Sequence, residues 1–398
     1  MRNALTAALC ALILAGCSGI TPFPVEVVRS EIVRCPEATF LDGQDGRLKW
    51  NYTTGLELKS FLDVYDAFPG KAFKGTGMTR DSLLKYVDNW YDSIIDSTGT
   101  IYKYKMSNYS VDHVCPGMTL FRLYDITGRE KYRMAMDTLY AQLKGQPRTA
   151  EGGFWHKRIY PGQMWLDGLY MAEPFYAAYT TRFVPDSLKA ACYKDIVHQF
   201  SLSFNRTLDP ETRLLRHAWD STGEMFWCNP DSGQSDHAWG RALGWYCMAL
   251  VDVYGIMPED SGREALAEIL RNLWETIPGF ADPDAGVWYQ VLDCPGREGN
   301  YLEATCSAMF AYSLLKGCRL GILDCRDYAE QTWKNVLKQF VTVDDGIVNL
   351  NSCCEVAGLG GKDNRRGDYD YYINEPVRSN DPKGIGPLVW AALEYERL

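Results

Sequence analysis

The feature that most constrains the fold of this chain is a recurring pair of helical segments. Residues 81–95 place apolar side chains three and four positions apart, with Thr79 as a candidate helix N-cap, and residues 266–277 repeat the pattern. Aromatic, charged or Gly-rich helix starts recur every 55 to 83 residues, marked by Tyr52, Asp112, Asp167, Asp236, Tyr301 and Gly384. Each interval accommodates a helix, a turn and a returning helix. Six such helical hairpins predict an all-α fold, an (α/α)6 barrel of inner and outer helices.

The N-terminal segment predicts an export signal. Arg2 precedes an apolar run over residues 4–15, which is shorter than the roughly 20 residues that cross a bilayer. The sequence Leu-Ala-Gly-Cys follows at its end, with Cys17 in the last position. This pattern is typical of bacterial lipoproteins, in which the cysteine is lipidated and becomes the first mature residue. A plain secretory signal that is cleaved nearby is the alternative.

We therefore expect three parts along the chain. Residues 1–17 are a lipoprotein signal peptide with Cys17 lipidated, residues 18–40 are a tether, and residues 41–398 are a single (α/α)6-barrel catalytic domain. The protein would be a cell-envelope lipoprotein of a bacterium, facing the periplasm or the surface, and a lipid anchor would be its only membrane contact. The net charge of −10 argues against a nucleic-acid partner.

Polar residues gather in the loops that precede the predicted inner helices. Four of the five histidines lie in or beside these loops, namely His113, His156, His217 and His237. In a ring of helical hairpins such loops lie at the same end of the barrel. The sequence therefore predicts a polar cleft at that end.

Two aspartates at predicted inner-helix starts are candidates for catalysis. Asp167 follows Trp165 and Leu166, and an apolar surrounding raises the pKa of a carboxyl group and suits it to act as a general acid. Asp112 occupies the corresponding position one hairpin earlier, and a second carboxylate nearby would favour the protonated acid further. For either residue alone, the alternative is a helix N-cap.

A third cluster, residues 239–245, has the sequence Trp-Gly-Arg-Ala-Leu-Gly-Trp. Its Arg241 could bind a substrate carboxylate through two parallel hydrogen bonds, and Trp239 and Trp245 offer ring faces for a sugar. An ion pair between Arg241 and Asp236 is the alternative. Because Lys157 adds positive charge at the same end of the barrel, the sequence favours a small acidic ligand.

The sequence gives no sign of a cofactor or a metal. It contains no Gly-x-Ser-x-Gly, P-loop, His-Glu-x-x-His or dinucleotide-binding motif. It also has no Cys-x-x-Cys pair, and no cysteine lies at zinc-ligand spacing from a histidine. We therefore expect neither a cofactor nor a metal in the reaction.

Four motifs in order along the chain resemble family 105 of the glycoside hydrolases, the unsaturated rhamnogalacturonyl hydrolases. They are Asp-His-Val-x-Pro-Gly at 112–117, the segment 154–171, the cluster 239–245, and the segment 371–387, which begins with Tyr-Tyr and ends with Gly-x-Gly-Pro. The resemblance covers nearly all of the chain from Trp50 to its end. It implies an (α/α)6 barrel, in agreement with the count of six hairpins.

The resemblance also implies a substrate and a reaction. The substrate would be a rhamnogalacturonan fragment with 4,5-unsaturated galacturonate at its non-reducing end. The aspartate matching Asp167 protonates C4 and water adds at C5, while the one matching Asp112 holds ring hydroxyls and helps keep Asp167 protonated. Other family substrate contacts match Tyr52, His156, Lys157, Trp165, His217, Trp239 and Arg241. Extra residues at 294–300 and 362–368 are expected to reshape the cleft rim.

Three other functions remain open from the sequence. An unsaturated glucuronyl hydrolase that acts on glycosaminoglycan fragments has the same fold and chemistry, but a sulfated substrate would favour a more basic rim. A lipoprotein that binds glycans without cleaving them would not need a desolvated acid. An inverting endo-glycanase would have an open groove, with its carboxylates roughly 6.5–9.5 Å apart.

Overall fold

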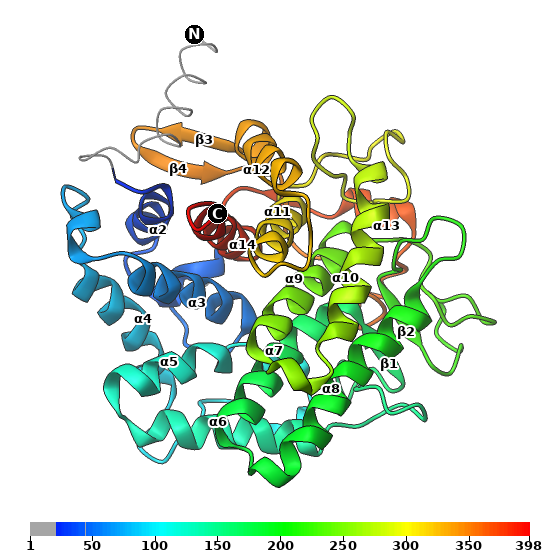
Figure 1. Ribbon diagram of the computed structural model, residues 1–398, viewed down its shortest axis with the longest axis horizontal. Coiled ribbons are helices and arrows are strands. Elements are labelled where there is room, and N and C mark those ends of the chain that lie inside the picture. Colours follow the sequence, from blue (N-terminus) through cyan, green and yellow to red (C-terminus); the bar gives the residue numbers. More distant parts are fainter. Residues whose placement is uncertain (1–20, 44) are drawn as a thin grey trace.

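The computed structural model describes residues 21–43 and 45–398, which form a ring of helices (Figure 1). Six inner helices are buried over most of their length and follow one another around the ring. They are α3 (Tyr52–Ala67), α5 (Gly117–Thr127), α7 (Leu166–Phe183), α9 (Gly240–Ile256), α11 (Ala304–Arg319) and α14 (Pro382–Tyr395). Each packs against the next, and α14 packs against α3 and closes the ring. The predicted all-α (α/α)6 barrel is confirmed.

Five outer helices return along the outside of the inner ones. They are α4 (Arg80–Ile94), α6 (Glu130–Lys144), α8 (Asp186–Thr207), α10 (Glu264–Thr276) and α12 (Arg326–Phe340). Their apolar stripes face inward, and α10 buries Leu266, Leu270 and Leu273 as its periodicity predicts. The expected N-cap of α4 is present, because the Thr79 hydroxyl accepts a hydrogen bond from the backbone N–H of Ser82 at 3.0 Å.

The sixth helix pair joins the two ends of the described chain instead of forming a hairpin. Helix α2 (Phe23–Arg34) packs against α14 and α3, and Val25, Val27 and Val28 are fully buried. The tether predicted for residues 18–40 is therefore wrong from residue 23 onward, because the apolar face of this segment completes the barrel wall. The predicted signal peptide and Cys17 lie outside the described residues. No helix among the described residues has the length and apolarity needed to cross a membrane.

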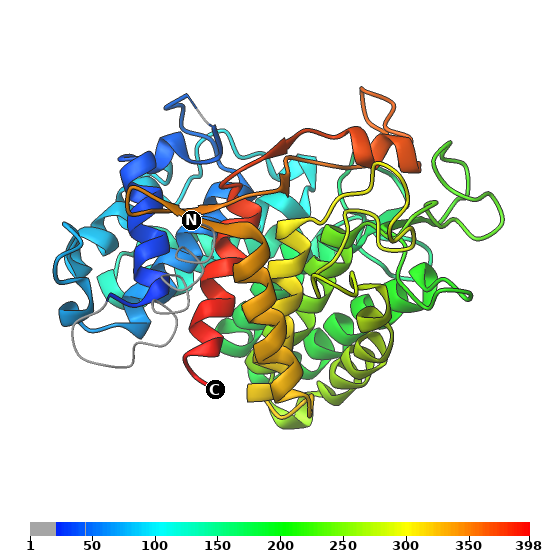
Figure 2. The ribbon, with the colours of Figure 1, turned by 90° about the horizontal axis from the view of Figure 1, so that it is seen from above.

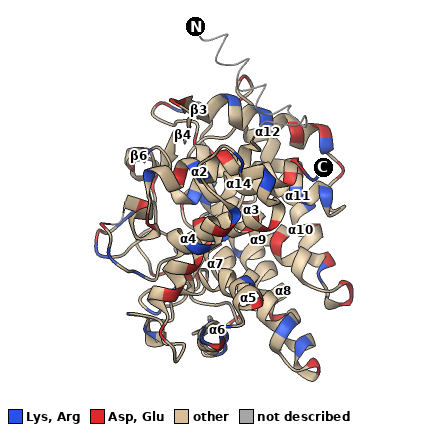
Figure 3. Ribbon diagram, turned by 90° about the vertical axis from the view of Figure 1, so that its left-hand side faces the viewer, with Lys and Arg blue, Asp and Glu red and all other residues tan. Residues whose placement is uncertain are grey.

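Short strands join the loops at the end of the barrel where the inner helices begin (Figure 2). Strand β1 (Gln163–Trp165) pairs antiparallel with β2 (Ala218–Asp220), and β3 (Val341–Asp344) pairs with β4 (Ile347–Leu350) beside α2. Strand β5 (Cys353–Cys354) pairs with β6 (Val377–Arg378), and the short helix α13 (Tyr369–Asn374) precedes β6. On the face shown in Figure 3, acidic and basic residues are interspersed.

Candidate functional site

Backbone hydrogen bonds between successive loops assemble the site. The N–H of Val111 donates to the carbonyl of His156 at 3.1 Å, which places His156 and Lys157 beside Asp112. The N–H of Leu166 donates to the carbonyl of His217 at 3.1 Å, which continues the β1–β2 pairing and places His217 beside α7. The loops that carry the predicted site residues therefore converge, as their positions before the inner helices predict.

Asp112 is a carboxylate held by two cationic or polar partners. It lies in a short 3-10 turn (Val111–His113), with Oδ2 at 2.5 Å from Nζ of Lys157 and Oδ1 at 3.3 Å from Nε2 of His156. Burial alone would raise the pKa of Asp112, but the charges of Lys157 and His156 outweigh burial and hold the pKa well below its usual range. Asp112 is therefore ionised in this site.

Asp167 has a different environment in the first turn of α7. Its Oδ2 lies 3.3 Å from Nε2 of His217, and no lysine or arginine forms an ion pair with it among the described residues. The Asp167 side chain is 16% exposed, whereas His217 is fully buried. Asp167 thus faces the cleft with one oxygen turned toward a buried imidazole.

The indole of Trp165 lies between the two histidines that contact these carboxylates. His156 stacks on the ring with centroids 4.6 Å apart, and His217 approaches its edge at 5.5 Å. Burial raises the pKa of the Tyr52 phenol, and the charges of Asp112 and Asp167 raise it further. Because the Trp165 indole contacts both histidines, and each histidine contacts one of the carboxylates, the two aspartates belong to one site with Trp165 on its wall.

Arg241 is enclosed beneath the site. Its side chain is 1% exposed, and its Nη2 contacts Oε1 of Glu303 and Oγ1 of Thr305 and donates to the carbonyl of Cys354. The alternative partner proposed from sequence, Asp236, is wrong, because Glu303 forms the ion pair. Glu303 is fully buried and also accepts the N–H of Cys306 at 2.7 Å as the N-cap of α11. The Arg241 clamp on a substrate carboxylate stays a prediction, and a substrate carboxylate would have to compete with Glu303 for this guanidinium.

The two tryptophans of residues 239–245 are packed against other side chains, so their ring faces are not open to a sugar. Trp239 and Trp245 are each 1% exposed. Trp245 packs against Tyr170 with ring centroids 4.7 Å apart and edge-on to Tyr52 at 6.5 Å, so we reassign it to the wall beneath Tyr52. Trp239 lies 4.8 Å from the His217 ring, and its Nε1–H donates to Oε1 of Gln290 at 3.1 Å.

The two segments expected to reshape the rim make different contacts. In the segment 294–300, the backbone carbonyl of Glu298 accepts a hydrogen bond from the Tyr369 hydroxyl at 2.9 Å. In the segment 362–368, Nη2 of Arg365 donates to the Tyr160 hydroxyl at 3.2 Å, and Tyr160 stacks on Trp165. Arg365 therefore reaches the site wall, a contact that sequence reasoning missed because a loop far along the chain supplies it.

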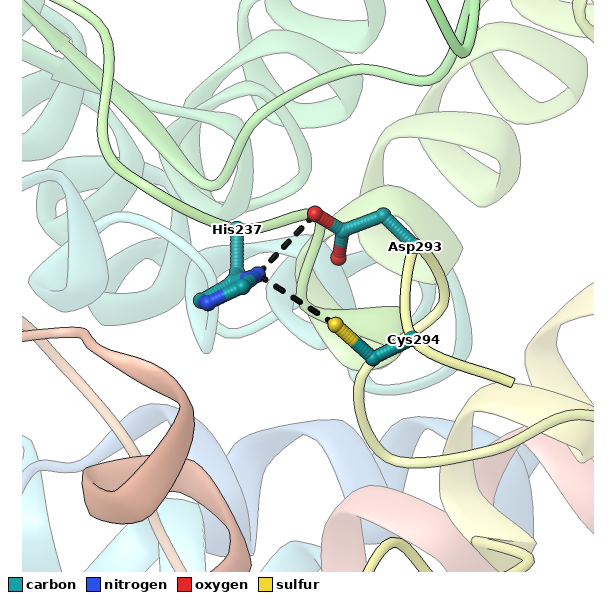
Figure 4. Close-up of side chains that lie close together, drawn as sticks. All are labelled: His237, Asp293 and Cys294. Atoms are coloured by element: carbon teal, nitrogen blue, oxygen red, sulfur yellow. Dashed lines mark hydrogen bonds and ion pairs between the residues drawn. The ribbon is translucent and has the colours of Figure 1, made fainter. Parts of the chain in front are cut away.

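One group in the described part of the chain has the spacing of metal ligands (Figure 4). Nδ1 of His237 lies 3.0 Å from Oδ2 of Asp293 and 3.8 Å from Sγ of Cys294. The same Asp293 oxygen lies 2.8 Å from Nη1 of Arg216. Because this guanidinium already neutralises the carboxylate, a divalent cation would meet a positive charge there. We interpret the group as a hydrogen-bonded cluster on the rim.

Activity is therefore expected to persist after exhaustive chelation. The wild-type protein would be dialysed against a strong chelator and assayed with and without added zinc or calcium. His237→Gln serves as the matched variant, because it removes the nitrogen ligand while Asp112 and Asp167 are unchanged. Loss of activity on chelation, restored by one divalent ion, would contradict the expectation.

The Lys157–Asp112 pair is expected to stabilise the fold in a pH-dependent way. The low pKa of Asp112 contributes stability above its unfolded value near pH 4, and the raised pKa of Lys157 contributes below its unfolded value of about 10. Lys157→Met should therefore lower the free energy of unfolding by about 1.5–3 kcal/mol at pH 7.

Urea denaturation over a pH series measures this effect, and the difference from wild type should shrink as pH falls below about 4. The control is Lys189→Met, because the partner of Lys189, Asp186, is 96% exposed and such pairs contribute little. Equal effects for the two variants at pH 7 would contradict the assignment.

Comparisons with known proteins agree with the fold. The family model described as Glycosyl Hydrolase Family 88 matches residues 25–398. The chain is 41% identical over 210 residues to protein Atu3128 of Agrobacterium fabrum, covering 50% of this chain and 89% of that protein. A solved family 105 glycoside hydrolase of C. acetobutylicum is 41% identical with a TM-score of 0.86, covering 94% of this chain and 99% of that one. The unsaturated glucuronyl hydrolase of Bacillus sp. GL1 shares the fold at 14% identity and a TM-score of 0.62, covering 94% and 95%.

Proposed function

Because the chain belongs to family 105 of the glycoside hydrolases, within the wider family 88 group, we propose that it is an unsaturated rhamnogalacturonyl hydrolase. It removes the 4,5-unsaturated galacturonate residue at the non-reducing end of rhamnogalacturonan-derived oligosaccharides by hydrating its double bond, so that this residue leaves as a keto-deoxyuronate. The observation that supports this most directly is the unequal pair of carboxyl groups. Asp112 is held ionised by Lys157, whereas Asp167 faces a buried imidazole without a lysine or arginine partner in the described chain.

The two carboxyl groups suit a hydration reaction. An ionised carboxylate favours the protonated form of a second carboxyl group in the same site. Asp167 then donates its proton to C4 of the enol ether, and positive charge develops at C5. A water molecule adds to C5 and returns a proton to Asp167, which acts as general acid and then as general base. The resulting hemiketal opens and releases the keto-deoxyuronate and the remaining oligosaccharide.

The other site residues bind and orient the sugar in this proposal. Asp112 accepts hydrogen bonds from ring hydroxyls, and Lys157, which is 26% exposed, offers its ammonium to the uronate carboxylate. Tyr52 and Trp165 line the site around the sugar ring. Arg241, which is buried, contributes positive charge to the site.

Incubation with lyase-digested rhamnogalacturonan tests the proposed function. Loss of ultraviolet absorbance from the conjugated double bond, with release of a saturated keto-uronate, is the expected result. Unsaturated disaccharides from sulfated glycosaminoglycans form a second arm, and faster turnover of these would favour the unsaturated glucuronyl hydrolase. Binding of either substrate without any loss of absorbance would identify a glycan-binding protein and overturn the proposal.

We also propose that the mature protein is a bacterial envelope lipoprotein anchored through Cys17. The support is the short apolar run that ends in Leu-Ala-Gly-Cys and the export that an extracellular polysaccharide fragment would require. Metabolic labelling with a fatty acid analogue in a bacterial host should label the full chain, and Cys17→Ala should abolish the label. An unlabelled wild-type chain would contradict the anchor without affecting the proposed reaction.

A further inference from the structure

Tyr372 belongs to the fourth sequence motif, residues 371–387, and it has no role in the reaction as proposed so far. It lies on α13, is fully buried, and its hydroxyl oxygen is 2.7 Å from Nδ1 of His217. The other ring nitrogen of His217, Nε2, lies 3.3 Å from Oδ2 of Asp167. Tyr372, His217 and Asp167 therefore form a continuous chain of polar atoms from α13 to the first turn of α7.

The direction of the first hydrogen bond follows from the buried phenol. A tyrosine hydroxyl has one proton to donate, and leaving it without an acceptor in a buried site is destabilising. In the described part of the chain, Nδ1 of His217 is the acceptor within hydrogen-bond distance of this hydroxyl. Burial raises the pKa of Tyr372 well above its ordinary value, so the proton stays on the phenol. His217 is then a neutral imidazole that carries its proton on Nε2.

We propose that Tyr372 is a positioning residue. Its hydroxyl fixes the His217 tautomer whose Nε2–H donates to Oδ2 of Asp167, so that the transferable proton of Asp167 lies on Oδ1. The consequence for catalysis rests on the proposed function, whereas the tautomer itself does not.

The opposite tautomer of His217 would keep the acid proton of Asp167 away from the substrate. With the proton on Nδ1, the lone pair of Nε2 would face Oδ2 of Asp167. The carboxylic acid proton would then be shared with His217 instead of being available to C4 of the sugar. In the structure these two atoms lie 3.3 Å apart but are not aligned as a hydrogen bond, and neither has another partner among the described residues. Catalytic hydrogen bonds are often poorly aligned without substrate and tighten when it is bound.

The activity test uses Tyr372→Phe, which removes one oxygen atom and keeps the ring that stacks near Trp239. We expect kcat to fall about 10- to 100-fold, the usual cost of removing the group that orients a functional histidine, with KM within about twofold of wild type. The control is Tyr246→Phe, which removes an equally buried hydroxyl that donates to the carbonyl of Phe200 at 2.8 Å. An unchanged kcat for Tyr372→Phe, or equal losses in both variants, would overturn the proposal.

A second measurement needs no substrate and reads the wild-type protein itself. Nuclear magnetic resonance of wild-type protein labelled with nitrogen-15 in histidine reads the protonation of each ring nitrogen, and five histidines make assignment through His217→Gln practical. We expect His217 to show a protonated Nε2 and an unprotonated, hydrogen-bonded Nδ1. A protonated Nδ1 overturns the proposal. If the tautomer is as expected but the unsaturated substrate is not turned over, the proposed function fails and the positioning of His217 stands.

Discussion

Replacing Asp167 by asparagine is expected to lower kcat by about 10²–10⁴-fold, because the variant keeps the size and polarity of the side chain but loses the proton that C4 must receive. KM should change little, since Lys157 and the walls formed by Tyr52 and Trp165 remain. Steady-state kinetics on the lyase-generated disaccharide measures both constants.

The matched control for this variant is Asp252→Asn. Asp252 has the same exposed fraction as Asp167, 16%, and it is bound by Lys316 at 2.6 Å and by the Tyr312 hydroxyl at 2.5 Å. It lies near the other end of the barrel, toward the C-terminal end of α9. A kcat for Asp167→Asn that stays within tenfold of wild type would show that another group supplies the proton.

Replacing Arg241 by methionine is expected to destabilise the fold more than any other single change considered. Arg241 and Glu303 are 1% and 0% exposed, and removal of one partner from a buried ion pair costs about 3–5 kcal/mol because the other charge is left uncompensated. Urea denaturation at pH 7 measures the loss.

The double variant Arg241→Met with Glu303→Gln separates charge from packing. We expect it to unfold at a higher urea concentration than Arg241→Met alone, because the unpaired carboxylate is gone. If Arg241→Met instead leaves stability unchanged and raises KM strongly, Arg241 is the carboxylate clamp that the sequence suggests and Glu303 is a minor partner.

The regular parts of the fold could be predicted from the sequence because they depend on local periodicity. The apolar stripe in residues 266–277 and the cap at Thr79 are encoded within one or two helical turns, so both were predicted correctly. Helix α2 was missed because its apolar residues follow the predicted signal peptide, after which a tether is the common outcome. Its burial depends on α14, which lies more than three hundred residues later in the chain.

In the candidate site too, some residues could be identified from the sequence around them, whereas their partners lie far away in the chain. Asp112, Asp167 and the nearby histidines were found because each lies at a helix start that the sequence marks. Other partners in the site come from distant parts of the chain: Glu303, the N-cap of α11, pairs with Arg241, and Tyr372 lies 155 residues from His217. An acidic residue before an apolar helix was a usable signal for Glu303, whereas only the folded loop brings Tyr372 to His217.

The site of proton transfer is the central claim, and deuterium incorporation measures it directly. Wild-type enzyme would be incubated in D₂O with the unsaturated disaccharide, and the product analysed by mass spectrometry and nuclear magnetic resonance early in the reaction. The proposed hydration predicts one deuterium at C4 of the keto-deoxyuronate and loss of the double bond in step with release of the second sugar. Release of a sugar that still contains the double bond, with no deuterium at C4, would contradict hydration and assign Asp167 to direct cleavage of the glycosidic bond.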